Sequence, residues 1–409
     1  MTDELSLDPS GPVLITGGYG TVGTELARMA AAGGLPVLLT GRTPERGRAL
    51  ARELGGEVRA WDLASPRPFR AAVRAVVSAV NDPDDRVLRA ALTAGVPQVD
   101  VTRWTARLQR AVTVAALARS AAPVLLSSAW MGGVTGLVAA ALARELGGAE
   151  RVETAVRWDL ADRAGADSVE FMDRLGIDFE VVEDGRRRLA APLSGARTVR
   201  IGADPVRVAR IDTPEQYTFP LTLGTATAAT RIGFGSPAVT RMLLALRGAG
   251  FFRWAGGERW APVRRAVLHS PGDGGTARLR IDVTHRGEAR TALVTDPAGQ
   301  ARLTAAGGYL GLLRVLGADG SPAPRGVVFP EQHPDPAAAL RLLAGLGARV
   351  DIERTGAPET PGTPGPSGPP KASGPPGAPG RPVPPGASGT PDTPRTPGPS
   401  GTPGTEAVA

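Results

Sequence analysis

The chain has 409 residues, of which 42% are hydrophobic, and its net charge is +7. This length exceeds one ordinary domain, and the hydrophobic share is sufficient for a packed core. Because the chain contains no cysteine, neither a disulfide framework nor a thiolate metal site can form. The three histidines are too widely spaced to suggest a metal site: His269, His285 and His333.

The positive charge comes almost wholly from scattered arginines, since Lys371 is the only lysine. Without a dense basic run interleaved with aromatic residues, nucleic-acid binding is not expected. The N-terminal residues lack the basic and hydrophobic regions of a signal peptide. The longest apolar run, residues 134–143, is too short to span a bilayer. We therefore expect a soluble, cytoplasmic protein with no membrane span.

Residues 13–23 predict a short apolar strand, a glycine-rich turn and the start of a helix. The turn has the G-x-G-x-x-G spacing of a dinucleotide-binding motif, in which the first glycine allows the tight turn. The second lets the main chain approach a pyrophosphate, and the third lets helix and strand pack closely. The free amides at the helix start would bind the phosphates. The expected contacts are Gly18, Tyr19, Gly20, Thr21, Val22 and Gly23.

The end of the next predicted strand, residues 36–40, indicates which dinucleotide binds. A site for NAD usually has an acidic residue there, which binds the ribose 2′-hydroxyl. This chain instead has Gly41, Arg42 and Thr43. A small residue leaves room for a 2′-phosphate, and the arginine offers it a planar set of donors, so NADP is favoured. The alternative is that Arg42 is one surface arginine among many.

Further strands are predicted at residues 57–63, 75–81, 98–102 and 123–128, with helices at 84–94 and 105–121. Strands that alternate with helices predict a Rossmann-type doubly wound parallel sheet, whose ligands lie beyond the carboxyl ends of its strands. The polar or adenine-contacting residues expected there are Asp62, Leu63, Asn81, Asp100 and Thr102. Of these, Asp62 and Leu63 are assigned to the adenine end and Asn81 to the crevice.

After about residue 150 the pattern changes to clustered strands, which predicts an inserted α+β substrate domain. Strands are expected at 152–158, 179–188 and 198–212, a hairpin at 277–284 and 289–295, and helices at 167–176, 237–248, 304–316 and 336–346. The expected division is 11–130 for the dinucleotide domain, 131–303 for the insertion and 304–353 for helices that return to the first domain. Residues 354–409 are a Pro/Gly-rich tail that we expect to be disordered and dispensable for catalysis.

Several segments together resemble the saccharopine dehydrogenase-like (saccharopine reductase-like) family. They are the glycine-rich opening, Leu-Thr-Gly-Arg at 39–42, Ala-Gly-Val-Pro-Gln-Val-Asp-Val-Thr at 94–102, the glycine-rich segment 128–137 and Gly-Val-Val-Phe-Pro-Glu-Gln at 326–332. The resemblance implies an NADP-binding Rossmann domain, an inserted substrate domain and a cleft between them. It also implies hydride transfer between nicotinamide and a C–N bond. Trp130 and Met131 depart from the family's usual residues, which puts saccharopine itself in doubt as substrate.

The leading hypothesis is an NADP-dependent oxidoreductase that acts on a small imine or amine, carbonyl or enoyl compound. The folded part contains no lysine, which excludes both a lysine-activated tyrosine and a Schiff base. The catalytic candidates are Asp100 and Thr102, with Tyr217, Arg231 or His285 from the second domain. Asp100 is equally explained as a hydrogen-bonding residue at a strand end. The alternative is an NADP-binding sensor or accessory protein without turnover; a homodimer through the insertion is possible in either case.

Overall fold

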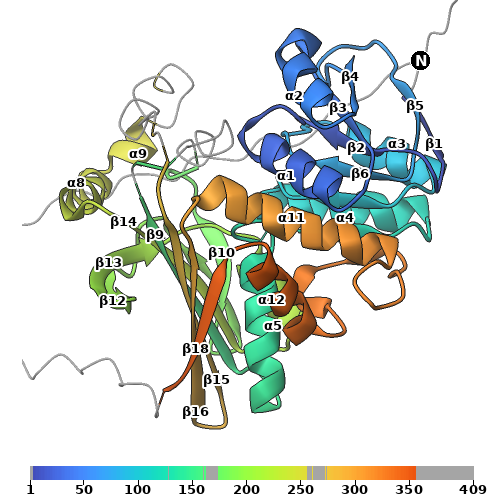
Figure 1. Cartoon of the computed structure of the whole chain (residues 1–409). Coiled ribbons are helices and arrows are strands. Elements are labelled where there is room, and N and C mark those ends of the chain that lie inside the picture. The colour runs from blue at the N-terminus through green and yellow to red at the C-terminus, as the bar shows by residue number, and fades with distance from the viewer. Residues whose placement is uncertain are drawn as a thin grey trace, which may run out of the picture. The chain divides into compact units, whose positions relative to one another are not determined.

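The first sheet is built from seven parallel strands in the order β17-β8-β7-β6-β2-β3-β4 (Figure 1). The computed structural model describes residues 3–127, 129–159, 161–162, 174–255, 260, 272 and 274–355. In chain order the strands of this sheet are β2 (Val13–Thr16), β3 (Val37–Gly41), β4 (Glu57–Ala60), β6 (Ala75–Ser78), β7 (Gln98–Asp100), β8 (Val124–Leu126) and β17 (Val327–Val328). Apart from the added edge strand β17, this is the strand order of a doubly wound dinucleotide-binding fold, as the sequence predicts.

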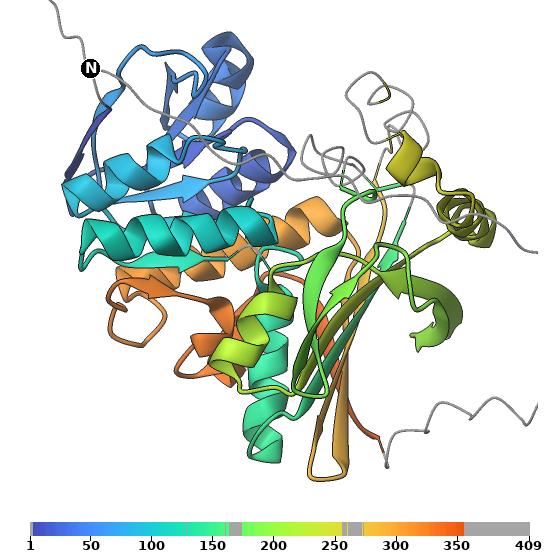
Figure 2. The same ribbon diagram turned by 180° about the vertical axis from the view of Figure 1, so that it is seen from behind.

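Helices cover both faces of this sheet because its central strands are apolar on both sides. Val13 and Ile15 of β2 pack under α1 and α11, which lie side by side in Figure 1, whereas Leu14 packs toward the α3 face seen in Figure 2. The helices and turns of this layer are α1 (Thr21–Ala32), η1 (Pro44–Gly47), α2 (Arg48–Glu53), α3 (Arg86–Ala94), α4 (Thr105–Ala118) and α11 (Gln300–Leu316).

The second sheet is mixed, with the strand order β12-β13-β14-β9-β15-β16-β18. Only β9 and β14 are parallel, and every other neighbouring pair is antiparallel. Its strands are β9 (Arg151–Trp158), β12 (Arg197–Ile201), β13 (Asp204–Arg210), β14 (Thr227–Phe234), β15 (Ala277–His285), β16 (Glu288–Asp296) and β18 (Arg349–Thr355). The predicted α+β insertion is thus confirmed, including the hairpin that turns at Arg286–Gly287.

A second core lies between this sheet and the helices that cover one of its faces (Figure 1). Helix α5 contributes an unbroken buried run from Val134 to Ala143, which explains the apolar segment in the sequence. The helices of this part are α5 (Val134–Leu146), α7 (Glu215–Thr222), α8 (Pro237–Gly248), α9 (Phe251–Trp254), the short turn η3 (Pro330–Gln332) and α12 (Pro336–Gly345). Both sheets belong to one compact unit.

Several elements differ from the predicted pattern. A small parallel pair, β1 (Glu4–Leu7) with β5 (Arg70–Val73), forms a sheet of its own. The hairpin expected at Gly185 is present as β10 (Phe179–Glu183) and β11 (Arg186–Ala190), but it stands apart from the second sheet. Strand β4 stops at Ala60 because Trp61 turns inward to stack on Phe69, with ring centroids 4.5 Å apart. Strands β14 and β18 and helix α7 were not predicted.

The C-terminal segment is shared between the two sheets. Helix α11 packs on α1, and β17 joins β8, as expected for a return to the first domain. Strand β18 instead pairs with β16 and forms an edge of the second sheet. Most of the helix predicted at 167–176 and the tail from 356 onward lie outside the described residues.

Candidate functional site

The glycine-rich turn links β2 to α1 in the geometry that a dinucleotide requires. A Cβ atom built on Gly23 would lie 2.1 Å from the Gly17 carbonyl oxygen, so helix and turn can approach this closely only without a side chain. Helix α1 begins after Gly20, whose backbone is extended and which offers no capping side chain. The amides of the first turn therefore face outward as anion donors. The left-handed residue of the turn is Gly17, at a φ of +70°, and not Gly18.

Tyr19 connects this turn to the end of β3 through a hydrogen bond. Its hydroxyl oxygen accepts a 2.9 Å hydrogen bond from the Thr43 amide. A Cβ on Gly41 would lie 2.3 Å from the same oxygen, and one on Gly47 would lie 2.5 Å from the ring. The room at Gly41, expected for a 2′-phosphate, is therefore filled by Tyr19. Arg42 remains exposed beside this contact, and none of the hydrogen bonds or ion pairs among the described residues involves it.

The turn after β6 completes the edge at which the strand order reverses. A Cβ on Gly17 would lie 2.8 Å from the Cβ of Val80, so the turns after β2 and β6 touch there. Asn81 follows Val80 and is half-buried. In open parallel sheets this switch point is where ligands bind. The two turns thus bring the amides at the start of α1 to the point where the strand order reverses.

The loop with Asp62 and Leu63 is held by a single guanidinium. Arg86 donates to the carbonyl oxygens of Asp62 at 3.2 Å and Leu63 at 2.9 Å, and it forms an ion pair with Asp3 at 2.8 Å. Both loop residues are half-buried just beyond the end of β4. This position is compatible with the predicted contact to an adenine, and it shows that Arg86 orders the loop.

Asp100 and Thr102, the catalytic candidates, are engaged in a buried network. One Asp100 carboxylate oxygen accepts bonds from the Thr102 amide (3.0 Å) and hydroxyl (2.8 Å), and the other accepts the Nε–H of Arg103 at 2.7 Å. Arg103 also pairs with Asp85 at 2.5 Å. Burial opposes ionisation of Asp85, but hydrogen bonds from Arg103 and Arg110 outweigh it and lower the pKa of that carboxyl. These contacts favour the alternative reading of Asp100 as a strand-end residue that orders the turn.

The three candidates from the second domain each have a structural contact. His285 ends β15 at the hairpin, 3.7 Å from Glu150, and Arg231 of β14 pairs with Glu153 at 3.0 Å. Tyr217 packs against the core beneath α4. The contacts of these three side chains are those of a hairpin, an ion pair and a residue beside the core, and a catalytic role for any of them stays a prediction.

A residue that the sequence did not single out, Glu215, lies at the junction of the two sheets. Its carboxyl accepts the Trp130 amide at 3.4 Å and the Thr230 hydroxyl at 3.0 Å. Complete burial raises the pKa of Glu215 to about 7, so about half of this carboxyl is protonated in neutral solution. No local signal could have revealed it, because a glutamate at a helix start is usually exposed and stabilises the helix dipole.

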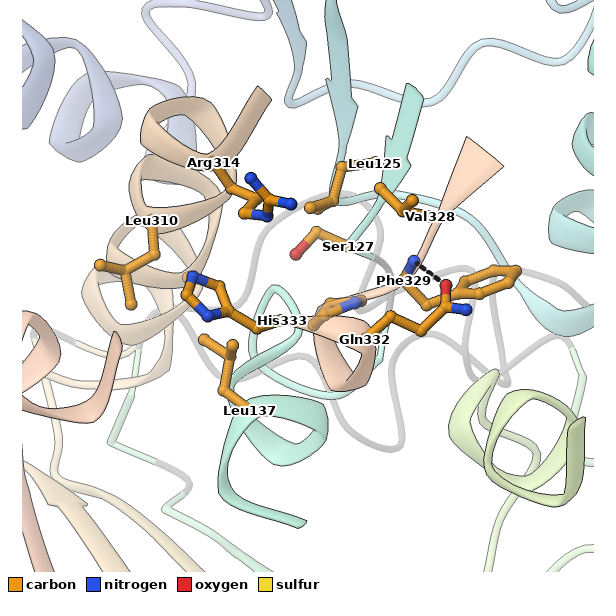
Figure 3. A pocket seen from close by; sticks show the side chains of 12 residues that line it. Leu125, Ser127, Leu137, Leu310, Arg314, Val328, Phe329, Gln332 and His333 are labelled. Atoms are coloured by element: carbon orange, nitrogen blue, oxygen red, sulfur yellow. Dashed lines mark hydrogen bonds between the residues drawn. The ribbon is translucent and has the colours of Figure 1, made fainter. Parts of the chain in front are cut away.

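The late segment 326–332 forms β17 and η3 and lines a small cavity under α11 (Figure 3). The cavity has a volume of about 20 Å³, which is room for about one water molecule and far less than a substrate needs. In Figure 3 the Phe329 amide donates to the Gln332 side chain at 3.0 Å. His333 at its rim bonds Asp319 at 2.9 Å, and burial lowers the pKa of the imidazole. The segment therefore closes the fold and does not form the site.

Among the described residues no cluster of side chains has the composition of a metal site. Within the same part of the chain, no helix combines the length and apolar character needed to cross a bilayer.

Comparison with solved structures confirms the fold that the motifs suggested. Saccharopine dehydrogenase (L-Glu forming) from Saccharomyces cerevisiae is similar with a TM-score of 0.61 and 13% identity, over 84% of this chain and 100% of that chain. An oxidoreductase from Agrobacterium radiobacter, in complex with NAD+, L-tartaric acid and magnesium, has a TM-score of 0.40 and 11% identity, over 82% and 94% of the two chains. A probable dehydrogenase from Thermotoga maritima has a TM-score of 0.38 and 14% identity, over 81% and 94%.

The last two TM-scores are too low to carry an argument. No family model and no curated protein matches the chain. At 13% identity the similarity to the yeast enzyme concerns architecture. The chain therefore has the fold of saccharopine dehydrogenase: a Rossmann-type sheet joined to a mixed second sheet.

Proposed function

We propose that the protein is an NADP-dependent oxidoreductase that transfers a hydride between nicotinamide and a small imine or amine, carbonyl or enoyl substrate. The observation that supports the proposal most directly is the glycine-rich turn between β2 and α1. Gly23 packs against the Gly17 carbonyl, and the first amides of a 12-residue helix stay open beside it. Such a helix start attracts phosphate through its free donors and its dipole.

The charge around the glycine-rich turn supports NADP, although Tyr19 fills the space at Gly41. The amides of Thr21, Val22 and Gly23 would hold the pyrophosphate, and the loop at Asp62 and Leu63 would contact the adenine. Arg42 and Thr43 would bind the 2′-phosphate, since Arg42 has its guanidinium in solvent next to the Tyr19 contact. When bound, the nicotinamide would supply the hydride chemistry.

The protein's own part in the reaction is orientation. Asn81, after β6, would lie beside the nicotinamide end. Asp100 and Thr102 would order the carboxyl end of β7 through the hydrogen bonds described above, with Arg103 neutralising the carboxylate. In this proposal they are positioning residues, because the Asp100 carboxylate is already bonded on both oxygens.

Calorimetry with NADPH and NADH tests the choice of cofactor. We expect NADPH to bind at least tenfold more tightly than NADH, and the Arg42→Asp variant to lose that preference through repulsion of the 2′-phosphate. Arg89→Asp makes the same charge change at an exposed residue of α3 and should keep the preference. Equal affinity for the two cofactors in the native protein would contradict the assignment to NADP.

A second candidate function is an NADP-binding sensor or accessory protein. The engagement of Asp100 with Arg103 and Thr102 favours it, because that network leaves no ready proton donor on β7. Oxidation of NADPH with a panel of carbonyl, imine and enoyl compounds separates the two functions. Tight NADPH binding with no turnover on any member of the panel would support the sensor.

A further inference from the structure

Helix α4, which covers the first sheet, is bonded at its start to the connection that follows β13 of the second sheet. The hydroxyl of Thr105, the first residue of α4, donates to a carboxylate oxygen of Asp212 at 2.6 Å. The Asp212 side chain is 10% exposed, and its other carboxylate oxygen pairs with Arg174. The Arg174 guanidinium carbon lies 5.3 Å from the centre of the Trp104 ring. The connection between β13 and α7 therefore holds the first residues of α4.

The next residues of α4 hold the loop after β6. Arg107 donates to the carbonyl oxygen of Asp82. Arg110 donates to the carbonyl oxygen of Pro83 and forms a 2.7 Å ion pair with Asp85. The two arginines are three residues apart, so they lie on one face of the helix. The position of α4 therefore determines where this loop lies.

The loop after β6 is the segment beside which we propose that the nicotinamide binds. Val80, at its beginning, meets the glycine-rich turn, since a Cβ on Gly17 would lie 2.8 Å from the Cβ of Val80. Asn81 follows directly. Asp85, at the end of the loop, has a left-handed φ of +55°, which is uncommon for a residue with a Cβ atom. The ion pair of Asp85 with α4 helps to hold the loop in this shape.

Helix α4 thus joins the second sheet to the loop after β6 over a short distance. Thr105 and Arg110 are five residues apart, which is about 8 Å along a helix axis. A helix carries a displacement over that length because it moves as a rigid element. If the hydrogen bond to Asp212 is lost, the start of α4 can shift, and the loop shifts with it.

We propose that Thr105 and Asp212 are positioning residues for the nicotinamide half of the cofactor. Their hydrogen bond fixes the start of α4 and, through the two arginines of that helix, the loop that carries Asn81. Neither of the two residues touches the cofactor itself. This inference deepens the proposed oxidoreductase function and rests on it. It makes the second sheet a support of the nicotinamide as well as the proposed substrate side.

Calorimetry on the full chain with two ligands tests this inference. NADP+ contains the nicotinamide, and 2′-phospho-ADP-ribose is the same nucleotide without it. Thr105→Val replaces the hydroxyl by a methyl group of similar size. We expect this variant to bind NADP+ at least about threefold more weakly than the native protein does, because the bond that fixes α4 is lost. Its affinity for 2′-phospho-ADP-ribose should change by less than about twofold, since we propose that the glycine-rich turn and Arg42 hold that half.

Further variants assign the effect to the hydrogen bond. Thr105→Ser keeps the hydroxyl and should bind NADP+ as the native protein does. Asp212→Ala removes the acceptor and should weaken NADP+ binding at least as much as Thr105→Val, and the double variant should bind no more weakly than Asp212→Ala alone. Thr113→Val is the matched control, because Thr113 is exposed on the same helix and its hydroxyl donates to the Gln109 carbonyl oxygen at 3.1 Å. Weaker NADP+ binding in Thr105→Ser or Thr113→Val would contradict the inference.

Binding to the native protein is measured first, so that the two proposals fail separately. If neither NADP+ nor NADPH binds, the oxidoreductase and this inference are both overturned. If NADP+ binds and its affinity is unchanged in Thr105→Val and Asp212→Ala, the oxidoreductase stands and the positioning role is wrong. Equal losses for NADP+ and 2′-phospho-ADP-ribose, or additive losses in the double variant, would also overturn that role, because they indicate a general effect on the fold.

Discussion

The two sheets of the molecule are built from contacts of different range. In the first, four of the six pairings join strands that follow one another in this sheet along the chain; the exceptions are β2 with β6 and β8 with β17. In the second, β9 lies between β14 and β15, whose residues come far later in the chain, and β18 closes an edge. The comparison teaches that the proposed cofactor side of the site is encoded mostly by local contacts and that the proposed substrate side is assembled at a distance.

The largest expected change in stability comes from a substitution that breaks the buried charge network of the first sheet. Arg103 is the shared partner of Asp85 and Asp100, and all three side chains are about 1% exposed. Arg103→Leu removes the ion pair of Asp100 and leaves Asp85 with Arg110 as its remaining cation, so we expect a loss of about 3–5 kcal/mol in the free energy of unfolding. Urea denaturation checks this value. A loss below about 1 kcal/mol would show that the network does not hold the turn after β7.

The next effect concerns the junction with the second sheet and depends on pH. The pKa of Glu215 is about 7 in the folded protein against an ordinary value of 4.5. As pH rises from 4.5 to 7, the unfolded chain loses this proton while the folded chain keeps it. The contribution of this proton to the free energy of unfolding is therefore complete below pH 4.5. It is lost as pH rises through 7, and the total loss is about 3 kcal/mol.

Glu215→Gln removes this titration while it keeps the shape and a hydrogen-bonding group. Denaturation at pH 5 and pH 8 should show a smaller loss of stability with rising pH in the variant than in the native protein. The matched substitution Glu288→Gln, at an exposed residue of β16, should leave the native dependence intact. Identical pH dependence in native protein and Glu215→Gln would show that Glu215 is ionised in the fold.

A smaller effect on stability is expected from a substitution in the glycine-rich turn. Tyr19→Phe removes the acceptor of the Thr43 amide but keeps the ring that packs on Gly41 and Gly47. We expect a loss of about 1 kcal/mol in stability. This bond joins the glycine-rich turn to Thr43, the residue next to Arg42. NADPH affinity should therefore fall a few-fold, and NADH affinity should be less affected. Equal losses for both cofactors would separate Tyr19 from 2′-phosphate binding.

Local patterns predicted most of the first sheet. The glycine spacing marked the turn in which Gly23 packs. The role of Arg42 in binding a 2′-phosphate stays a prediction. The bonds from Thr102 to Asp100 also agree with the strand-end alternative, since they span two residues. The filling of the space at Gly41 by Tyr19 was not foreseen, because it depends on how a turn and a strand 20 residues apart meet.

The junction between the two sheets and the edge of the second sheet could not be predicted in the same way. Glu215, Trp130 and Thr230 come from three separate segments, and only the packing of α7 against β14 and the turn after β8 brings them together. In the sequence, β18 looks like an irregular charged segment. In the fold it is a strand because it pairs with β16. These contacts have no periodicity in the sequence and appear only in the fold.

The most direct test of the central claim is calorimetric titration of NADPH into native protein, Gly23→Ala and Gly248→Ala. The methyl group at Gly23 would meet the Gly17 carbonyl at 2.1 Å, whereas at Gly248, the last residue of α8, it would meet nothing within 4 Å. We predict that native protein and Gly248→Ala bind NADPH alike, and that Gly23→Ala binds at least 100-fold more weakly or not at all. Unchanged affinity in Gly23→Ala would contradict the account.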